Sequence, residues 1–216
     1  ERVKTTKINN LLTICPYVYM PLHFQPESST ETMGGFFVDQ LLFAKFIRDI
    51  IPKNWKIIFK RPPLDLTPRP YLRHKGFWDF LKNIENSLII DNQTKSEDLI
   101  KLSKLVASPT GTSNFEANLL GIPSIYGGFS NFAASPIACQ IKELNTKNDF
   151  NLWYEKVSKN NLAERYNQMT KFINQIEYKS IPGKFYKIGE FSKLEKKETL
   201  SHLNIIFNSL KNQFLL

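Results

Sequence analysis

The segment 105–131 most constrains the fold of this chain, because it holds the pattern of a strand, a turn, a helix and a second strand. Residues 105–107 are apolar and predict a buried strand, and residues 124–126 predict another. Between them, Gly121 marks the end of a helix, and Pro123 lies just beyond it. A unit of this kind is typical of α/β sheets, in which strands alternate with helices.

The turn before this helix is rich in hydroxyl groups and comprises Thr110, Gly111, Thr112 and Ser113. Its side chains can cap the helix, and Glu116 follows Ser113 at the spacing of a capping box. The free N–H groups and the dipole of such a helix start can also bind an anion. Both readings stay open at this point: an ordinary capped helix and an anion-binding turn.

Strands and helices alternate along much of the remaining chain. Apolar runs predict further strands over residues 11–22, 55–60 and 87–90, and periodic patterns predict helices over 36–51, 76–84, 97–103, 136–144, 150–159, 162–176 and 194–215. This alternation predicts an α/β fold, with a Rossmann-like doubly wound parallel sheet and a helical C-terminal region. We expect residues 1–12 to be a lead-in or linker, 13–146 the Rossmann-like domain, and 147–216 helices that pack on it.

The composition of the chain is compatible with several kinds of binding partner. The net charge of +9 permits a phosphorylated substrate, an anionic membrane surface or nucleic acid, but no nucleic-acid-binding module is present, so that partner is not expected. Cys15 and Cys139 lie far apart and fit buried thiols in a reducing compartment. With no spanning apolar run and no signal peptide in the sequence, we expect a cytoplasmic protein.

Three loops follow predicted strands, and parallel sheets bind ligands beyond the carboxyl ends of their strands. The candidate side chains are His23, Gln25 and Glu27 in the first loop, Lys60, Arg61, Arg69 and Arg73 in the second, and Thr110, Thr112, Ser113 and Glu116 in the third. They offer cations for a phosphate, hydroxyl groups, and a carboxylate for a ribose diol. This chemistry suits a nucleotide or a nucleotide-sugar. The sequence has no dinucleotide-binding or Walker glycine motif and no metal-ligand cluster, so we expect neither a metal nor a resident cofactor.

Each candidate also has a structural alternative. His23 could only form a hydrogen bond within its loop, and Lys60 and Arg61 could be solvated surface charges. Glu116 could act only as the partner in the capping box. Position in the chain does not decide between these alternatives.

Five segments together resemble the capsular polysaccharide biosynthesis proteins, which include bacterial transferases of 3-deoxy-manno-octulosonic acid (Kdo) from its CMP donor. The resemblance covers roughly residues 17–132 and is carried by Tyr19 to Glu27, Gly34 to Gln40, Lys60 to Pro63, Thr110 to Ala117, and Gly121 to Pro123. The family is similar to GT-B glycosyltransferases, which have two Rossmann-like domains. The resemblance therefore implies that this chain is the C-terminal, donor-binding half of such an enzyme, acting in capsule or surface polysaccharide synthesis.

The resemblance also implies roles for single residues. Together with the chemistry of the loops, it leads us to expect catalysis from His23, Lys60 and Arg61, with Arg61 as a cation beside the departing phosphate, and nucleotide-sugar binding by Gln25, Glu27, Thr110, Gly111, Thr112, Ser113 and Glu116. Lys60 would approach the phosphate or carboxylate of the donor, and Glu116 the ribose. The implied partners are a nucleotide-sugar, a glycan or glycolipid acceptor, a preceding acceptor domain or partner chain that supplies an acidic catalytic residue, and the inner face of the cell membrane.

One departure from the family pattern bears on activity. The family has Lys-Glu-His-Pro where this chain has Lys60, Arg61, Pro62 and Pro63, so Pro62 replaces a histidine. Arg61 could substitute as the cation, the donor could differ, or transfer could be lost. A second hypothesis therefore stands beside the transferase: a non-catalytic module of the same fold that binds a nucleotide or a glycan.

Overall fold

A computed structural model of the chain describes residues 16–25, 28–62, 76–90 and 94–179. The chain divides into two compact units, residues 1–169 and 170–216, and the sheet and the candidate site both lie in the first unit. The boundaries expected at residues 12 and 146 stay predictions. The predicted helix over 194–215 and the side chains of Glu27, Arg69 and Arg73 lie outside the described residues.

Every strand pair in the described part of the chain is parallel, and the strands form one sheet in the order β3-β2-β1-β4-β5-β6. The strands are β1 (Tyr17–Pro21), β2 (Lys56–Lys60), β3 (Ser87–Ile90), β4 (Leu105–Ser108), β5 (Ser124–Tyr126) and β6 (Ala138–Gln140). This order confirms the predicted Rossmann-like doubly wound fold.

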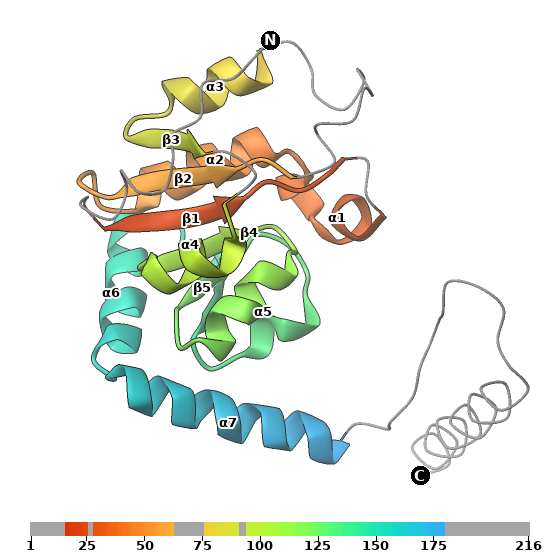
Figure 1. The fold of residues 1–216 in the computed structure, drawn as a ribbon, viewed down its shortest axis with the longest axis vertical. Helices are drawn as coiled ribbons and strands as arrows, with labels where there is room; N and C mark the ends of the chain where they lie inside the picture. The colour runs from red at the N-terminus through yellow and green to blue at the C-terminus, as the bar shows by residue number, and fades with distance from the viewer. Residues whose placement is uncertain (1–15, 26–27, 63–75, 91–93, 180–216) are drawn as a thin grey trace, which may run out of the picture. The chain divides into compact units, whose positions relative to one another are not determined.

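Helices cover both faces of the sheet. The described helices are α1 (Ser28–Met33), α2 (Gln40–Ile50), α3 (Phe77–Asn83), α4 (Ser96–Leu102), α5 (Thr112–Leu119), α6 (Lys147–Ser158) and α7 (Leu162–Lys179), with short 3-10 helices η2 (Gly35–Val38), η4 (Asn131–Ala134) and η5 (Ile141–Glu143). In Figure 1, α4 and α5 lie in front of the sheet, and α2 lies behind it. Apolar residues of α2, α3 and α6 pack against one face, and those of α4 and α5 pack against the other.

Alternation along each strand separates these two cores. In β1, Val18 and Met20 join the core under α2, whereas Tyr17 and Tyr19 join the core under α4 and α5. Successive side chains of a strand point to opposite faces, so adjacent residues in the sequence are divided between the two cores. The same alternation decides where the residues at the end of β2 point.

The connection between strands changes direction between β1 and β4. After β1 the chain builds β2 and β3 on one side, and it then crosses to the other side of β1 to build β4, β5 and β6. Such a switch leaves a crevice outside the carboxyl ends of the two central strands, because the loops that follow them diverge. The loops after β1 and β4 are two of the three predicted to hold the site.

The buried side chain of Arg48 attaches α2 to the loops that precede β2 and β3. Its guanidinium donates to the backbone carbonyls of Trp55 (2.7 Å) and Ile51 (3.3 Å) through separate nitrogens. It also donates to the carbonyls of Pro52 (2.5 Å) and Glu85 (3.4 Å). A buried guanidinium without acceptors would destabilise the fold, so these carbonyls hold the C-terminal end of α2 in place.

The helix predicted over residues 136–144 is wrong. This segment contains strand β6, followed by η5. Ile137, Cys139 and Ile141 are all buried, which is the two-residue period of a strand. Ile137, Ile141 and Leu144 also match a helical period, and Pro136 had suggested a helix start.

Two predicted helix starts also need correction. The helix expected from residue 36 begins at Gln40, because the side chain of Asp39 accepts hydrogen bonds from the N–H groups of Leu41 and Leu42. The helix expected from residue 150 begins at Lys147, and Asp149 is the third position of a capping box whose N-cap is Thr146. Asp39 and Thr146 are residue types that favour the N-cap position, and they were the available signals.

Candidate functional site

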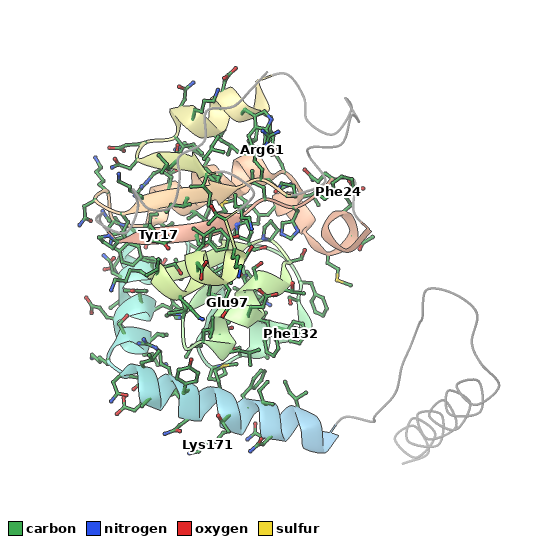
Figure 2. The ribbon with its side chains drawn as sticks, in the orientation of Figure 1. Tyr17, Phe24, Arg61, Glu97, Phe132 and Lys171 are labelled. Atoms are coloured by element: carbon green, nitrogen blue, oxygen red, sulfur yellow. The ribbon has the colours of Figure 1, made fainter. Side chains whose placement is uncertain are left out.

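A cleft of about 330 Å³ opens where β1 and β4 end. Its lining comes from the two loops at the switch point and comprises Pro21, Leu22, His23, Phe24, Ser108, Thr110, Gly111, Thr112 and Ser113. The predicted residues Thr110 to Ser113 therefore share one cleft with His23. Figure 2 shows Phe24, from the first of these loops, close to α1.

His23 is held against the second loop by Ser108, the last residue of β4. The imidazole Nε2 of His23 lies 2.6 Å from Ser108 Oγ. The same Oγ accepts a hydrogen bond from the N–H of Gly111 at 3.0 Å. A single buried hydroxyl thus joins the ring from the β1 loop to the backbone before α5.

Gly111 permits this approach because it has no side chain. A Cβ at position 111 would lie 2.5 Å from Ser108 Oγ and 3.1 Å from His23 Cε1. Real Cβ atoms do not come so close to an oxygen, and the backbone of Gly111 is extended rather than left-handed. The requirement for glycine therefore comes from the space beside His23 and Ser108 and not from backbone strain.

The backbone of His23 is fixed by the side-chain amide of Gln40, which is 1% exposed. The Oε1 of Gln40 accepts from the N–H of His23 at 2.7 Å, and its Nε2 donates to the carbonyl of His23 at 3.2 Å. Nε2 also donates to Gln25 Oε1 at 2.8 Å, and Gln25 Nε2 donates to the carbonyl of Val38 at 2.9 Å. Gln25 therefore helps to order this loop.

Helix α5 does not begin with the predicted capping box. It starts at Thr112, its N-cap is Gly111, and no side chain caps it. Ser113 lies inside the first turn, and Ser108 bonds to the Gly111 N–H from outside the helix. The cleft is lined by Thr112 and Ser113, in the turn where a helix lacks internal acceptors for its N–H groups. A phosphate or carboxylate bound in this position would face the positive end of the helix dipole.

Lys60 belongs to a polar cluster between α4 and α5. Its Nζ donates to Ser96 Oγ at 2.9 Å, and the phenol of Tyr19 donates to the same oxygen at 3.2 Å. Burial raises the pKa of Tyr19 to about 12, and the negative charge of Glu116 also raises it. The carboxylate of Glu116 therefore acts on the same cluster as Lys60 and Ser96.

Arg61 points to the other face of the sheet. Its guanidinium carbon lies 4.5 Å from the ring centroid of Trp78, a residue of α3. Figure 2 shows Arg61 on the α3 side of the sheet. Lys60 and Arg61 therefore contact different helices, α4 and α3.

Three residues of the site were missed as site residues in the sequence: Ser108, Gln40 and Ser96. Ser108 ends a buried strand immediately before the hydroxyl-rich turn, and this position at a strand end was the available signal. Ser96 directly precedes the helix expected over 97–103, but α4 begins at Ser96 and its N-cap is Lys95. Gln40 lies in one of the segments that carry the resemblance, but its partners are 15 and 17 residues away, so the sequence did not show its contacts.

The described residues were searched for metal sites and for helices long and apolar enough to span a membrane. Over the described ranges, no group of three or more His, Cys, Asp or Glu side chains could hold a metal ion. Within the same ranges, every helix is too short or too polar to cross a bilayer.

Comparison with solved structures gives matches among glycosyltransferases and related enzymes. One is the KpsC β-Kdo 2,7-transferase of Thermosulfurimonas dismutans, with 20% identity over 72% of this chain and 44% of that chain, and a TM-score of 0.47. The KpsC β-Kdo 2,4-transferase of the same organism matches with 15% identity over the same shares and a TM-score of 0.45. MnaA of S. aureus, solved with UDP, matches with 11% identity over 89% of this chain and 52% of that chain, and a TM-score of 0.46.

These likenesses concern the fold alone. Two of these three structures are KpsC Kdo transferases. The chain spans about half the length of these structures or less. No family model matches the chain, and no curated protein matches it.

Proposed function

We propose that this chain is the donor-binding part of a glycosyltransferase that uses a nucleotide-sugar. The observation that carries the proposal is the cleft at the switch point, where His23, Ser108 and the start of α5 meet. In an open parallel sheet this is the position at which nucleotides bind, and the first turn of α5 suits their phosphate. The sequence resemblance supports the same class of ligand.

In the proposed complex each group has one task. The N–H groups at the start of α5 and the Lys60 ammonium stabilise the negative charge of the departing phosphate. The carboxylate of Glu116, exposed on α5, accepts hydrogen bonds from the ribose diol. His23 faces the sugar side of the cleft, and its ring is oriented by Ser108.

The finer assignment follows the sequence resemblance. The donor would be CMP-Kdo, the acceptor a glycan or glycolipid of the bacterial surface, and a second domain or partner chain would complete the enzyme. Such an enzyme would work at the inner face of the membrane, where its acceptor is available. These assignments belong to the proposal and are tested with it.

A second candidate function is a module that binds the nucleotide-sugar without transferring the sugar. Pro62, which stands where the family has a histidine, favours it, and so does Arg61, which is directed toward Trp78 instead of toward Lys60. Transfer from CMP-Kdo to a lipid or glycan acceptor, measured with the proposed second domain or partner chain supplied, distinguishes the transferase from the binding module. Binding without transfer would support the module.

Both candidate functions require the chain to bind a nucleotide-sugar. Calorimetric titration with CMP, CMP-Kdo and a UDP-sugar tests this binding. We expect the wild type to bind at least one of them, and Glu116→Ala to weaken that binding about tenfold by loss of a charge-assisted hydrogen bond. Glu155→Ala is the matched control, because Glu155 is an exposed glutamate of α6 on the opposite face of the sheet. A folded wild type that binds none of the three would overturn the proposal.

A further inference from the structure

Asn114, the third residue of α5, is completely buried against the ends of two strands. Its side-chain Nδ2 donates to the backbone carbonyl of Ser108 at 3.2 Å and to that of Ile125 at 2.8 Å. Ser108 is the last residue of β4, and Ile125 is the middle residue of β5. One amide group therefore joins the start of α5 to both strands.

The orientation of this amide follows from its partners. Both atoms that Nδ2 contacts are carbonyl oxygens, which accept hydrogen bonds and cannot donate them. Exchanging the nitrogen and the oxygen of the amide would place three oxygens against one another. The two bonds therefore require the amide of asparagine, and an apolar or acidic side chain of the same size could not make both.

Ser108 is also the residue that orders the cleft. Its Oγ lies 2.6 Å from His23 Nε2 and accepts from the N–H of Gly111, while its carbonyl accepts from Asn114. Asn114 directly follows Ser113, which lines the cleft, although Asn114 itself is not part of that lining. The distance between the first turn of α5 and the imidazole therefore depends on the amide of Asn114.

A second buried asparagine, Asn118, lies one turn further along the same face of α5. It is also 0% exposed, and its Nδ2 donates to the carbonyl of Ile122 at 3.0 Å. Its Oδ1 accepts from the hydroxyl of Ser124, at the start of β5. The two asparagines thus share residue type, burial and helix face, but only Asn114 is bonded to a residue that lines the cleft.

We propose that Asn114 is a positioning residue of the nucleotide-sugar site, which holds the first turn of α5 where its N–H groups meet the phosphate of the donor. The inference rests on the proposed function, because it adds a residue to the same site. Hydrogen bonds to a phosphate weaken steeply when their donors are displaced, so the affinity depends on how firmly this turn is held. Loss of the amide should therefore weaken ligands through their phosphate and spare the nucleoside part.

The test compares Asn114→Ala with Asn118→Ala, which leaves a cavity of the same kind one turn away. The probes are the nucleotide that the wild type binds and its nucleoside, either CMP with cytidine or UDP with uridine. Calorimetry measures the nucleotide, and NMR titration measures the weaker nucleoside. We expect Asn114→Ala to weaken the nucleotide about tenfold and the nucleoside by less than about twofold. Asn118→Ala should change both by less than about twofold.

A pH profile of Asn114→Asp separates positioning from a general loss of stability. The carboxylate repels the two carbonyls, whereas the protonated carboxyl can donate one hydrogen bond to them. Burial beside these carbonyls raises the pKa of such a carboxyl. The affinity for the nucleotide, relative to the wild type at the same pH, should therefore rise as the pH falls from about 9 to about 5.5. A constant relative affinity over this range would contradict the inference.

Two further outcomes would overturn the inference while the proposed function stands. One is an unchanged ratio of nucleotide to nucleoside affinity in Asn114→Ala. The other is the same change in both alanine variants, which indicates a purely structural role. A folded wild type that binds no nucleotide and no nucleotide-sugar overturns the inference and the proposed function together. If Asn114→Ala does not fold, Asn114→Asp decides the question, because it keeps the buried volume.

Discussion

His23 and Ser108 are 85 residues apart in the sequence, yet His23 Nε2 lies 2.6 Å from Ser108 Oγ. The contact crosses from the end of β1 to the end of β4 at the switch point of the sheet. Because Ser108 also accepts from Gly111, the position of the imidazole and the start of α5 depend on the same oxygen. Changes at any of these residues should therefore alter both sides of the cleft.

Gly111→Ala tests how tightly this contact is packed. The added Cβ would lie 2.5 Å from Ser108 Oγ, so we expect the free energy of unfolding to fall by about 1–3 kcal/mol, as for other overpacked sites. Chemical denaturation measures this loss, and titration with CMP measures the accompanying loss of affinity. The same substitution in a Ser108→Ala background should cost less, because the nearest atom has gone. Equal costs in both backgrounds would show that the crowding lies elsewhere.

Gln40→Leu tests the order of the β1 loop. Leucine keeps most of the buried volume but removes the acceptor of the His23 N–H and the donor to Gln25 Oε1. Each unsatisfied buried group costs about 1–3 kcal/mol, so a loss of roughly 2–4 kcal/mol in urea denaturation is expected. Gln175→Leu, at an exposed position of α7, is the control and should leave stability nearly unchanged. A small effect at both positions would mean that water replaces the amide of Gln40.

Lys60 and Arg61 should behave differently despite being neighbours. We expect Lys60→Met to weaken CMP binding about tenfold or more, because it removes a cation from the polar cluster. Arg61→Met should leave the affinity within about twofold and lower stability by about 0.5–1 kcal/mol through loss of the contact with Trp78. Parallel titration and thermal melts of the two variants measure this. A larger loss of affinity for Arg61→Met than for Lys60→Met would restore Arg61 as the cation of the site.

Stability should decrease in alkaline solution. Burial raises the pKa of Tyr19 from 10.0 to about 12 and that of Cys139 from 9.0 to about 12, and it also raises the pKa of Tyr17 and Tyr126. The unfolded chain ionises these groups at their ordinary pKa values, whereas the folded chain keeps them neutral. Their contribution is therefore complete below about pH 9 and is lost as the pH rises toward about 12.

Melting temperatures measured across this range provide the check. Tyr19→Phe removes one of the ionisable groups and should make the decline shallower, provided that the variant keeps its core. A melting temperature that stays constant up to about pH 11 would contradict the prediction, because groups with such shifted pKa values have to destabilise the fold there.

The strands of the sheet were largely predictable because four of them are short apolar runs between turns. The prediction for residues 87–90 and 124–126 matches β3 and β5 to the residue. The sixth strand was not predictable, because the buried residues of 137–144 fit the period of a strand and of a helix equally well. Pairing with β5 decides between them, and that contact is absent from local sequence.

The site was predictable as a set of loops but not as a set of contacts. Strand ends identify which loops meet at the edge of a parallel sheet, so His23 and the turn from Thr110 could be grouped in advance. The directions of Lys60 and Arg61 follow from alternation only after the register of β2 is known. The bonds made by Gln40 and Ser96 join positions 15 to 77 residues apart, which no local pattern encodes.

Helix α2 connects the cleft to the loops at the other end of the strands. Gln40, in its first turn, accepts from the N–H of His23, and Arg48, in its last turn, donates to backbone carbonyls of two other loops. Both ends of one helix are thus anchored by buried hydrogen bonds. Local opening of the β1 loop would require α2 to detach, so amide protons at His23 and in the α2 helix should exchange with solvent together, as one cooperative unit. The ordered conformation of the β1 loop then depends on contacts throughout the domain. A variant that weakens the hydrogen bonds of Arg48 should shorten the time that this loop spends in its binding-competent form.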